Sequence, residues 1–291
     1  MTEIEATTSA HVIAIAGDIA MLVGLKHKKH VFRLEPGRTL HTHRGELKHD
    51  QLIGTPWGTI VRSHLGRTFH LLEPSLADLI NELPRRTQIL YPKDIGFILL
   101  NLGVGPGKWV GEAGSGSGAM TLALSHFVGD NGHVLSYDLH QDSLELARKN
   151  LNRFGHPKRV SFTLRDISEG IDAGQPLDAF FLDVPNPEAV LAQVRACLKP
   201  GGGFACIVPT TNQLSVLLET LENNLFAFIE ICEIMLRYYR PNPQRLRPTD
   251  RMIAHTGFLV FARPVMEREV PTENSHRVSG PDEDADDADG S

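Results

Sequence analysis

The feature that most limits how this chain can fold is a set of glycines at alternate positions, Gly114, Gly116 and Gly118. Residues 109–110 precede the glycines as a strand would, and the apolar residues of 120–124 follow with helical character. Glycine is needed where a turn demands positive φ and where a ligand approaches the backbone too closely for a side chain. The pattern therefore predicts a strand that turns into a helix around a nucleotide-like ligand, although this turn taken alone could be a plain loop.

Acidic residues end each of the next three predicted strands, Asp138 after 133–137, Asp166 after 160–165 and Asp183 after 178–182. A carboxylate at the first position can accept two hydrogen bonds from a ribose diol, and Asp166 is placed for an adenine amino group. Each aspartate taken singly could instead cap a helix or stabilise a turn. Together, an acid after each of these strands at one edge of the sheet is typical of a methyltransferase. The glycine spacing agrees, because nicotinamide dehydrogenases usually place the third glycine of the turn one residue later.

The spacing of apolar residues predicts the rest of the sheet and its helices. Leu144, Ala147, Leu151 and Phe154 recur at intervals of three, four and three, which marks one helix face packed on a sheet. Later strands are expected at 204–208, at 226–236 with interruptions, and at 257–261. The predicted fold class is α/β, a seven-stranded Rossmann-like class I methyltransferase with a small N-terminal β-domain.

Three regions divide the chain. Residues 1–73 are expected to form the N-terminal β-rich domain, with a hairpin of 59–62 and 68–72. Residues 74–265 are assigned to the methyltransferase domain and its linker, which carries a short helix at 76–80. Residues 266–291 are expected to be a disordered acidic tail, since the six acids of 281–291 equal the whole formal net charge of −6.

Composition fits a folded cytoplasmic protein. Hydrophobic residues make up 41% of the chain, yet no run approaches the ~20 apolar residues of a membrane span. The N-terminus lacks a basic region followed by an apolar core, so no secretory signal is expected. Cys197, Cys206 and Cys232 form no Cys-x-x-Cys pair, which favours buried thiols in a reducing compartment over a zinc site or disulfides.

Two parts of the chain concentrate basic residues. Five arginines lie within fifteen positions beside Tyr238 and Tyr239, and they predict either a phosphate-binding loop or a solvated connection between the last two strands: Arg237, Arg240, Arg245, Arg247 and Arg251. The front domain holds Lys26, Lys28, Lys29 and Arg44, for which we favour a surface patch that meets phosphates.

Histidines also gather in the front domain, at His27, His30, His41, His43 and His49. On one strand, His41 and His43 would place both rings on one face, a spacing that suits a metal ion. The sequence fixes no suitable third ligand, so we expect no metal site.

Several segments are similar to those of the bacterial and archaeal tRNA (adenine-N1)-methyltransferases that modify the T-arm adenine at position 58. They cover nearly the whole expected folded chain: Arg33–Gly37, His41–Gly45, Leu52–Gly54, Tyr91–Asp94, Glu112–Gly118, Asp183–Pro185 and His255–Arg263. The Tyr-Pro-Lys-Asp and His-Thr-Gly segments, in this order around a methyltransferase core, are more specific than the glycine turn. The resemblance implies tRNA as the partner and a homotetramer as the assembly.

The resemblance also implies S-adenosylmethionine as the cofactor. The residues expected around it are Gly114, Ser115, Gly116, Ser117, Gly118, Ala119, Met120, Asp138, Ser143, Asp166 and Asp183. Substrate contacts are expected from Tyr91, His255, Arg237 and Arg240. Many members of the family carry an aromatic residue near the end of the fifth strand. At that position this chain has Ile207.

Asp183 is the expected catalytic residue, because the resemblance implies that it faces the target base. Adenine N1 has a lone pair and attacks without losing a proton, so the enzyme must chiefly align donor and acceptor. A carboxylate that accepts a hydrogen bond from the exocyclic amine would stabilise the charge developing on the ring. No aromatic follows Asp183-Val184-Pro185, so the base must stack elsewhere, for which Tyr91 is a candidate; it could equally be a core aromatic.

Two other functions stay open at this point. One is a methyltransferase that acts on a protein carboxylate, of the isoaspartyl type, or on a small molecule; it would need neither RNA nor the β-domain. The other is a noncatalytic RNA-binding module with a vestigial cofactor fold, against which the intact glycines and acids argue.

Overall fold

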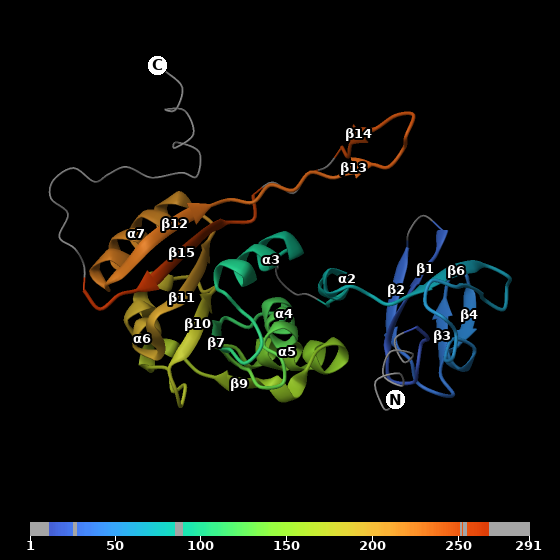
Figure 1. Cartoon of the computed structure of the whole chain (residues 1–291), viewed down its shortest axis with the longest axis horizontal. Coiled ribbons are helices and arrows are strands. Elements are labelled where there is room, and N and C mark those ends of the chain that lie inside the picture. The colour runs from blue at the N-terminus through green and yellow to red at the C-terminus, as the bar shows by residue number, and fades with distance from the viewer. Residues whose placement is uncertain (1–11, 26–27, 85–89, 251, 253–254, 268–291) are drawn as a thin grey trace, which may run out of the picture.

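The computed structural model describes residues 12–25, 28–84, 90–250, 252 and 255–267. Most of the predicted acidic tail, together with Lys26, His27 and Arg251, lies outside these residues. Figure 1 shows a small β-rich unit beside a larger α/β unit, joined by a segment that carries α2 (Leu76–Asn81). None of the described helices is long and apolar enough to cross a membrane.

The β-rich unit contains an antiparallel sheet in the order β2-β1-β6-β5. Its strands are β1 (Ile19–Val23), β2 (Lys29–Arg33), β5 (Ile60–Arg62) and β6 (Thr68–Leu72). A second antiparallel pair is formed by β3 (Thr39–Thr42) and β4 (Gly45–Lys48), followed by the short turn η2 (His49–Gln51). The expected hairpin of 59–62 and 68–72 appears as β5 and β6, which pair with each other.

The two faces of this sheet are buried against different partners. Because side chains alternate along a strand, Ala20 and Leu22 of β1 enter the β-unit's own core, whereas Met21 enters the core of the larger unit. On β2, Phe32 likewise enters the core of the β-unit, and Val31 enters the core of the larger unit. The β-unit is therefore docked on the α/β unit through apolar side chains of its central strands.

The larger unit is built on a seven-stranded sheet in the order β12-β15-β11-β10-β7-β8-β9, which confirms the predicted fold class. Its strands are β7 (Trp109–Ala113), β8 (His133–Asp138), β9 (Val160–Leu164), β10 (Leu177–Leu182), β11 (Leu198–Val208), β12 (Phe226–Cys232) and β15 (Phe258–Pro264). Strand β15 runs antiparallel to both of its neighbours, whereas β9, β8, β7, β10 and β11 are parallel.

Helices cover both faces of this sheet. One apolar core includes residues of α3 (Pro92–Asn101), α4 (Ala119–Phe127) and α5 (Gln141–Phe154); the other includes residues of α6 (Leu191–Cys197) and α7 (Thr211–Asn223). The four residues predicted to form one face of the helix at 144–154 are all buried. Three short turns complete this unit: η3 (Pro157–Arg159), η4 (Ile167–Glu169) and η5 (Pro187–Val190).

Some local expectations are wrong. The third strand of the sheet ends at Leu164, and Asp166 instead caps η4, because its side chain accepts a hydrogen bond from the Ser168 backbone. Strand β3 ends at Thr42, so His43 lies in the following turn and does not share a strand face with His41. Within the described part of the chain, no group of three or more His, Cys, Asp or Glu side chains could hold a metal ion.

The arginine-rich segment is neither a strand of the main sheet nor an irregular loop. Strand β12 ends at Cys232, before the predicted end at 236, and the chain leaves the sheet to form a two-stranded hairpin of β13 (Tyr239–Arg240) and β14 (Arg247–Pro248). Figure 1 shows this hairpin projecting from the α/β unit on a long stalk. We call residues 233–250 the arm.

Candidate functional site

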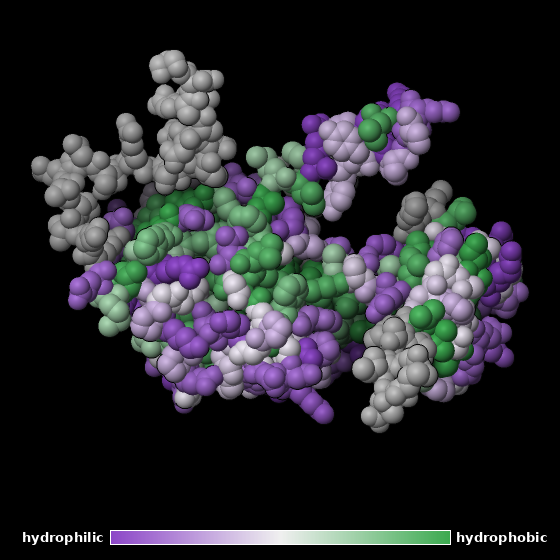
Figure 2. All heavy atoms as spheres, viewed as in Figure 1, coloured by the Kyte–Doolittle hydropathy of each residue, from purple (hydrophilic) through white to green (hydrophobic). Residues whose placement is uncertain are grey.

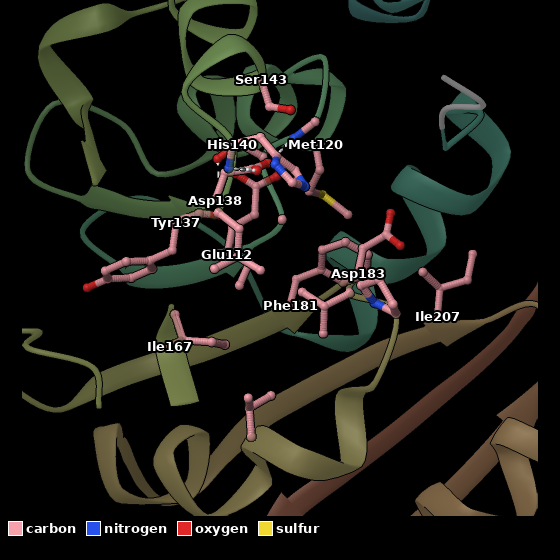
Figure 3. Close-up of a pocket in the computed structure, with 18 of the residues that line it drawn as sticks. Glu112, Met120, Tyr137, Asp138, His140, Ser143, Ile167, Phe181, Asp183 and Ile207 are labelled. Atoms are coloured by element: carbon pink, nitrogen blue, oxygen red, sulfur yellow. Dashed lines mark hydrogen bonds between the residues drawn. The ribbon is translucent and has the colours of Figure 1, made fainter. Parts of the chain in front are cut away.

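A cavity of about 840 Å³ opens at the carboxyl ends of the parallel strands. It is lined by residues that follow β7, β8, β9, β10 and β11 (Figure 3). The sheet order reverses between β7 and β10, and ligands of open α/β sheets bind at such a reversal. A volume in the range of about 300–1,000 Å³ suits a small-molecule ligand.

The glycine turn forms one wall of this cavity. Gly116 and Gly118 have φ of +52° and +80°, which L-residues rarely adopt, so the expectation of positive φ is met at two of the three glycines. At Gly114, a Cβ atom would lie 3.1 Å from the Asp183 carbonyl oxygen. Backbone proximity therefore explains the first glycine, and backbone conformation explains the other two.

Asp138 fixes the shape of the turn. Its Oδ2 accepts a hydrogen bond of 3.0 Å from the Gly116 N–H, and its Oδ1 accepts one of 2.9 Å from the His140 N–H. The carboxylate also lines the cavity. The predicted ribose-binding acid thus tethers the glycine turn to the end of β8.

Glu112 is a functional candidate that sequence reasoning missed, although it precedes the first glycine by two residues at the end of a strand. Its Oε2 accepts hydrogen bonds from Thr121 Oγ1 (2.6 Å) and Ser136 Oγ (2.7 Å). Its Oε1 is buried and has no partner among the described residues. Burial raises the pKa of Glu112 to about 7, the nearby carboxylates of Asp183 and Asp138 add to the rise, and the two hydroxyls oppose it.

Asp183 follows β10 directly and is fixed through its backbone. Its N–H donates to the Ala113 carbonyl (2.5 Å), and its carbonyl accepts from the Gly114 N–H (3.3 Å). The side chain is open to the cavity and makes no hydrogen bond with any described residue; Figure 3 shows it on the same side of the view as Ile207. Solvent reaches the carboxylate through the cavity, but the surrounding protein limits its hydration and raises the pKa of Asp183 to about 6.

The cavity brings together most of the residues predicted to bind the cofactor. The lining includes Gly114, Ser115, Gly116, Ser117, Ala119, Met120, Asp138, Ser143, Asp166 and Asp183. Gly118 does not line it and instead packs on α5, where a Cβ would lie 3.0 Å from Ala147 Cα. Lining residues that the sequence did not indicate include Leu90, His140, Arg165, Asn186 and Gln213. They come from loops and from α7, where no periodic pattern marks a residue as facing a ligand.

The predicted substrate residues lie outside the cavity lining. Tyr91 directly precedes α3 and is half-buried next to Leu90, which does line the cavity. Arg237 and Arg240 are exposed on the arm, and Arg240 pairs there with Asp250. These residues could meet a substrate larger than the cavity, but not a ligand enclosed by it.

His255 supports the cavity from outside. Its Nε2 donates to the carbonyl of Pro209 (3.1 Å), a cavity-lining residue, and its Nδ1 pairs with Glu233 at the base of the arm. Both ring nitrogens donate when the imidazole is protonated, and the hydrogen bond with Glu233 raises the pKa of His255.

Lys93 links the two segments on which the family resemblance chiefly rests. Its Nζ donates to Asp94 Oδ1 (2.7 Å) and to Thr256 Oγ1 (2.8 Å), although the two segments are 163 positions apart. The next residue, Gly257, packs so closely that a Cβ would lie 2.7 Å from Ile207 Cγ1. The cavity wall at Ile207 is therefore supported from behind by both segments.

Comparison with known proteins agrees with this geometry. The model of the family described as the tRNA methyltransferase complex GCD14 subunit matches residues 68–251, and the TrmI-like N-terminal model matches residues 15–61. The tRNA (adenine(57)-N(1)/adenine(58)-N(1))-methyltransferase TrmI of Methanocaldococcus jannaschii is 34% identical over 71% of this chain and 82% of its own. The tRNA (adenine(58)-N(1))-methyltransferase TrmI of Thermus thermophilus is 30% identical over 78% and 89%.

Two solved structures extend the comparison to the fold. A protein described as a SAM-dependent O-methyltransferase from Thermotoga maritima is 40% identical, with a TM-score of 0.81 over 90% of this chain and 98% of its own. The tRNA (m1A58) methyltransferase TrmI of Aquifex aeolicus is 34% identical, with a TM-score of 0.73 over 88% and 100%. Both relatives span the β-unit as well as the α/β unit, given their coverage of this chain.

Proposed function

The chain belongs to the GCD14 and TrmI family of tRNA methyltransferases, and on this premise we propose that it methylates N1 of the adenine at position 58 of the tRNA T-arm. The observation that carries the proposal is the Asp183 carboxylate, which is open to the cavity and free of hydrogen bonds with the described residues. Because this carboxylate has no hydrogen-bond partner among the described residues, it is available to accept a hydrogen bond from the exocyclic amine of an adenine.

The cavity fits S-adenosylmethionine as the methyl donor. Two buried oxygen atoms at its lining, Glu112 Oε1 and Ser117 Oγ, have no partner among the described residues and would be satisfied by the polar end of a ligand. The glycine turn leaves backbone accessible there. When bound, the donor supplies an electrophilic methyl group on a sulfonium, and Asp138, Ser143 and Asp166 would hold its ribose and adenine.

The protein's own contribution to catalysis would be alignment and charge stabilisation. Adenine N1 needs no general base, so no side chain has to take a proton from it before methyl transfer. Asp183 would accept a hydrogen bond from the exocyclic amine and stabilise the positive charge that develops on the ring. Because the target adenine belongs to a folded tRNA, it would have to be unstacked to reach Asp183.

Stacking of the flipped base is assigned to Tyr91. The chain has Ile207 where many relatives have an aromatic residue, and Ile207 lines the cavity. The support for Tyr91 is its place directly before α3 and next to the lining residue Leu90. His255, Arg237 and Arg240 would act on parts of the tRNA outside the cavity.

A second candidate function is O-methylation of a carboxylate or a small molecule. The observation in its favour is the 40% identity with the Thermotoga maritima protein described as a SAM-dependent O-methyltransferase. This reaction would proceed without RNA, so RNA dependence separates the two functions.

The deciding experiment incubates the purified protein with labelled donor and an unmodified tRNA transcript that has guanine at position 57. We expect one methyl group per tRNA, mapped to N1 of A58, and none on the matched transcript in which guanine replaces A58. Equal labelling of both transcripts, or labelling that needs no RNA, would overturn the proposal.

A homotetramer is part of the same proposal. Figure 2 shows hydrophobic side chains gathered on the surface of the α/β unit, and the exposed apolar residues include Leu100 of α3 and Ile231 of β12, with Met235 at the base of the arm. Contiguous exposed apolar surface of this kind marks association sites. The number of four subunits comes from the family resemblance, so light scattering coupled to size-exclusion chromatography should give four times the chain mass of 32.1 kDa.

A further inference from the structure

Basic side chains from two separate hairpins of the β-unit converge on one spot. Lys28, at the end of the β1–β2 hairpin, places its Nζ 3.4 Å from Nδ1 of His43, which lies in the β3–β4 turn. The ring of His30 on β2 lies 6.3 Å from the ring of His43. We refer to Lys28, His30, His43 and Arg44 as the β-unit cation cluster.

Arg44 is held in place by its backbone and by a contact with an aromatic ring. Its backbone N–H donates to Thr42 Oγ1 (3.0 Å), and its backbone carbonyl accepts from Ser63 Oγ (2.7 Å). The side chain is held by Phe69, whose ring centroid lies 5.5 Å from the guanidinium carbon. The turn is fixed by Gly45, whose φ of +104° and close approach to Ser63 exclude a side chain. The guanidinium is therefore oriented before any ligand binds, which lowers the entropic cost of binding one.

The cluster differs from the basic residues around it. Neighbouring cations have carboxylate partners: Lys29 pairs with Asp78, and Arg38 lies 3.4 Å from Glu35. His41, in the adjoining strand, lies 3.1 Å from Glu46. Among the described residues, no carboxylate pairs with the four members of the cluster.

Crowding within the cluster has an electrostatic cost. Burial lowers the pKa of His30, and the nearby charges of Lys28 and His43 lower it further. The buried Nε2 atom of His30 also has no hydrogen-bond partner among the described residues. An anion that entered the cluster would offset the repulsion and offer acceptors to the guanidinium and the ammonium.

We propose that the β-unit cation cluster binds a phosphate group of the RNA backbone. The inference rests on the proposed function, because the tRNA is the polyanion that this protein would meet. A planar guanidinium beside a mobile ammonium suits a tetrahedral oxyanion, since the first gives a fixed fork of donors and the second a point charge. Phosphate and sugar receive half or more of the hydrogen bonds that proteins make with nucleic acids, and arginine and lysine are prominent among the donors, which favours the backbone as the target of the cluster.

The position of the cluster suits a large substrate. Figure 1 shows the turn end of the β1–β2 hairpin and the arm rising on the same side of the molecule, and the arm carries Arg237, Arg240, Arg245 and Arg247. One tRNA could thus contact the arm and the β-unit while its T-arm enters the cavity. The β-unit would set where the tRNA lies, without touching the reacting atoms.

The test measures the affinity for unmodified tRNA from 50 to 250 mM KCl in the full-length protein. The variant combines Lys28→Gln with Arg44→Gln. Its matched control combines Arg38→Gln with Lys48→Gln, which removes the same charge at the opposite end of the β3–β4 hairpin. We expect the test variant to bind tRNA about tenfold more weakly at low salt and to lose about one unit of salt-dependence slope, with little change in the control.

Three further readouts make the result decisive. Donor affinity and the methylation rate at saturating tRNA should match the wild type. Lys28→Gln alone, at an exposed residue that pairs with no carboxylate among the described residues, should show part of the loss without a change in melting temperature. If test and control variants share the same tRNA affinity and slope, the proposal is wrong. If instead inorganic phosphate binds the wild type below about 1 mM and the test variant keeps its tRNA affinity, the cluster is a site for free phosphate. A wild type that binds tRNA through the cluster but does not methylate it would refute the proposed function alone.

Discussion

At the scale of single residues, two carboxyl groups on neighbouring strands share one cavity and have different tasks. Glu112 is enclosed and receives two hydroxyl donors, whereas Asp183 receives none from the described residues and is open to the ligand. Burial keeps Glu112 half-protonated near neutrality, with a pKa of about 7, which reduces its repulsion of Asp183. The geometry thus leaves Asp183 as the carboxylate available to a base.

Replacing Asp183 tests this division. Asp183→Asn keeps the size of the side chain but removes the charge that would stabilise the methylated ring, so the single-turnover rate should fall on the order of 10²–10³-fold. Donor affinity, measured by calorimetry, should fall much less, because the glycine turn and Asp138 are unchanged. A variant that turns over at the wild-type rate would contradict the catalytic assignment.

The pH profile of the same step follows from the raised pKa. Asp183 must be ionised to stabilise the positive charge that develops on the ring, so kcat/KM should fall about tenfold per pH unit below its pKa of about 6 and level off above it. Glu112→Gln is the control, since it removes the other carboxyl that titrates nearby. If Glu112→Gln abolishes the acid limb, Glu112 and not Asp183 sets the pH dependence.

At the scale of elements, the start of α3 and residues 255–257, which lead into β15, form a brace behind the cavity wall. The brace depends on Lys93, which donates to Asp94 and Thr256, and on the tight contact of Gly257 with Ile207. His255 adds a second connection from the arm base to Pro209. The base of the arm is therefore connected through His255 to the wall of the cavity.

Thr256→Val removes one hydrogen bond of the brace and keeps the shape of the side chain. A hydrogen bond to a charged group is worth about 1.5–3 kcal/mol, and a loss of about 1 kcal/mol of this in tRNA binding should raise KM for tRNA about five- to tenfold while kcat and donor affinity change little. Steady-state kinetics with tRNA and donor varied separately gives the three values. Thr256→Ser keeps the hydroxyl group and should have a KM for tRNA close to that of the wild type. If Thr256→Val and Thr256→Ser raise KM equally, loss of the hydrogen bond is not the cause.

Contacts between residues distant in the sequence, such as those of the brace, could not be predicted from the sequence. Apolar spacing and the glycine turn were sufficient for the seven strands, the α5 face and the shared edge where Asp138 and Asp183 meet, because each of these depends on local periodicity. The Lys93–Thr256 contact joins residues 163 positions apart, and no local pattern encodes such a pairing. The partners of Glu112 were missed for the same reason, and the end of β9 was misplaced because a capping aspartate resembles one that ends a strand.

At the scale of the whole molecule, the β-unit is joined to the α/β unit by a shared core. Met21 and Val31 pack in the same cluster as Leu79 and Ile80 of α2. Arg153 of α5 adds a polar connection, since its guanidinium donates to the Val31 carbonyl (3.2 Å) and its own carbonyl accepts from the Arg33 guanidinium (2.8 Å). The β-unit is thereby held at a fixed place relative to the cavity, which a long substrate bound at both requires.

Truncation of a buried side chain at this joint should destabilise both the β-unit and α2. Met21→Ala removes a buried side chain from the shared core and should cost about 2–5 kcal/mol of the free energy of unfolding. Hydrogen exchange should then rise in α2 as well as in β1, because Leu79 and Ile80 belong to the same apolar cluster as Met21. Leu22→Ala is the matched control: the next residue along β1 points into the β-unit's own core, so its loss should raise exchange in that unit and leave α2 protected. Equal protection of α2 in the two variants would mean that the joint does not depend on Met21, and the fixed placement of the β-unit would have to come from Arg153 and the linker instead.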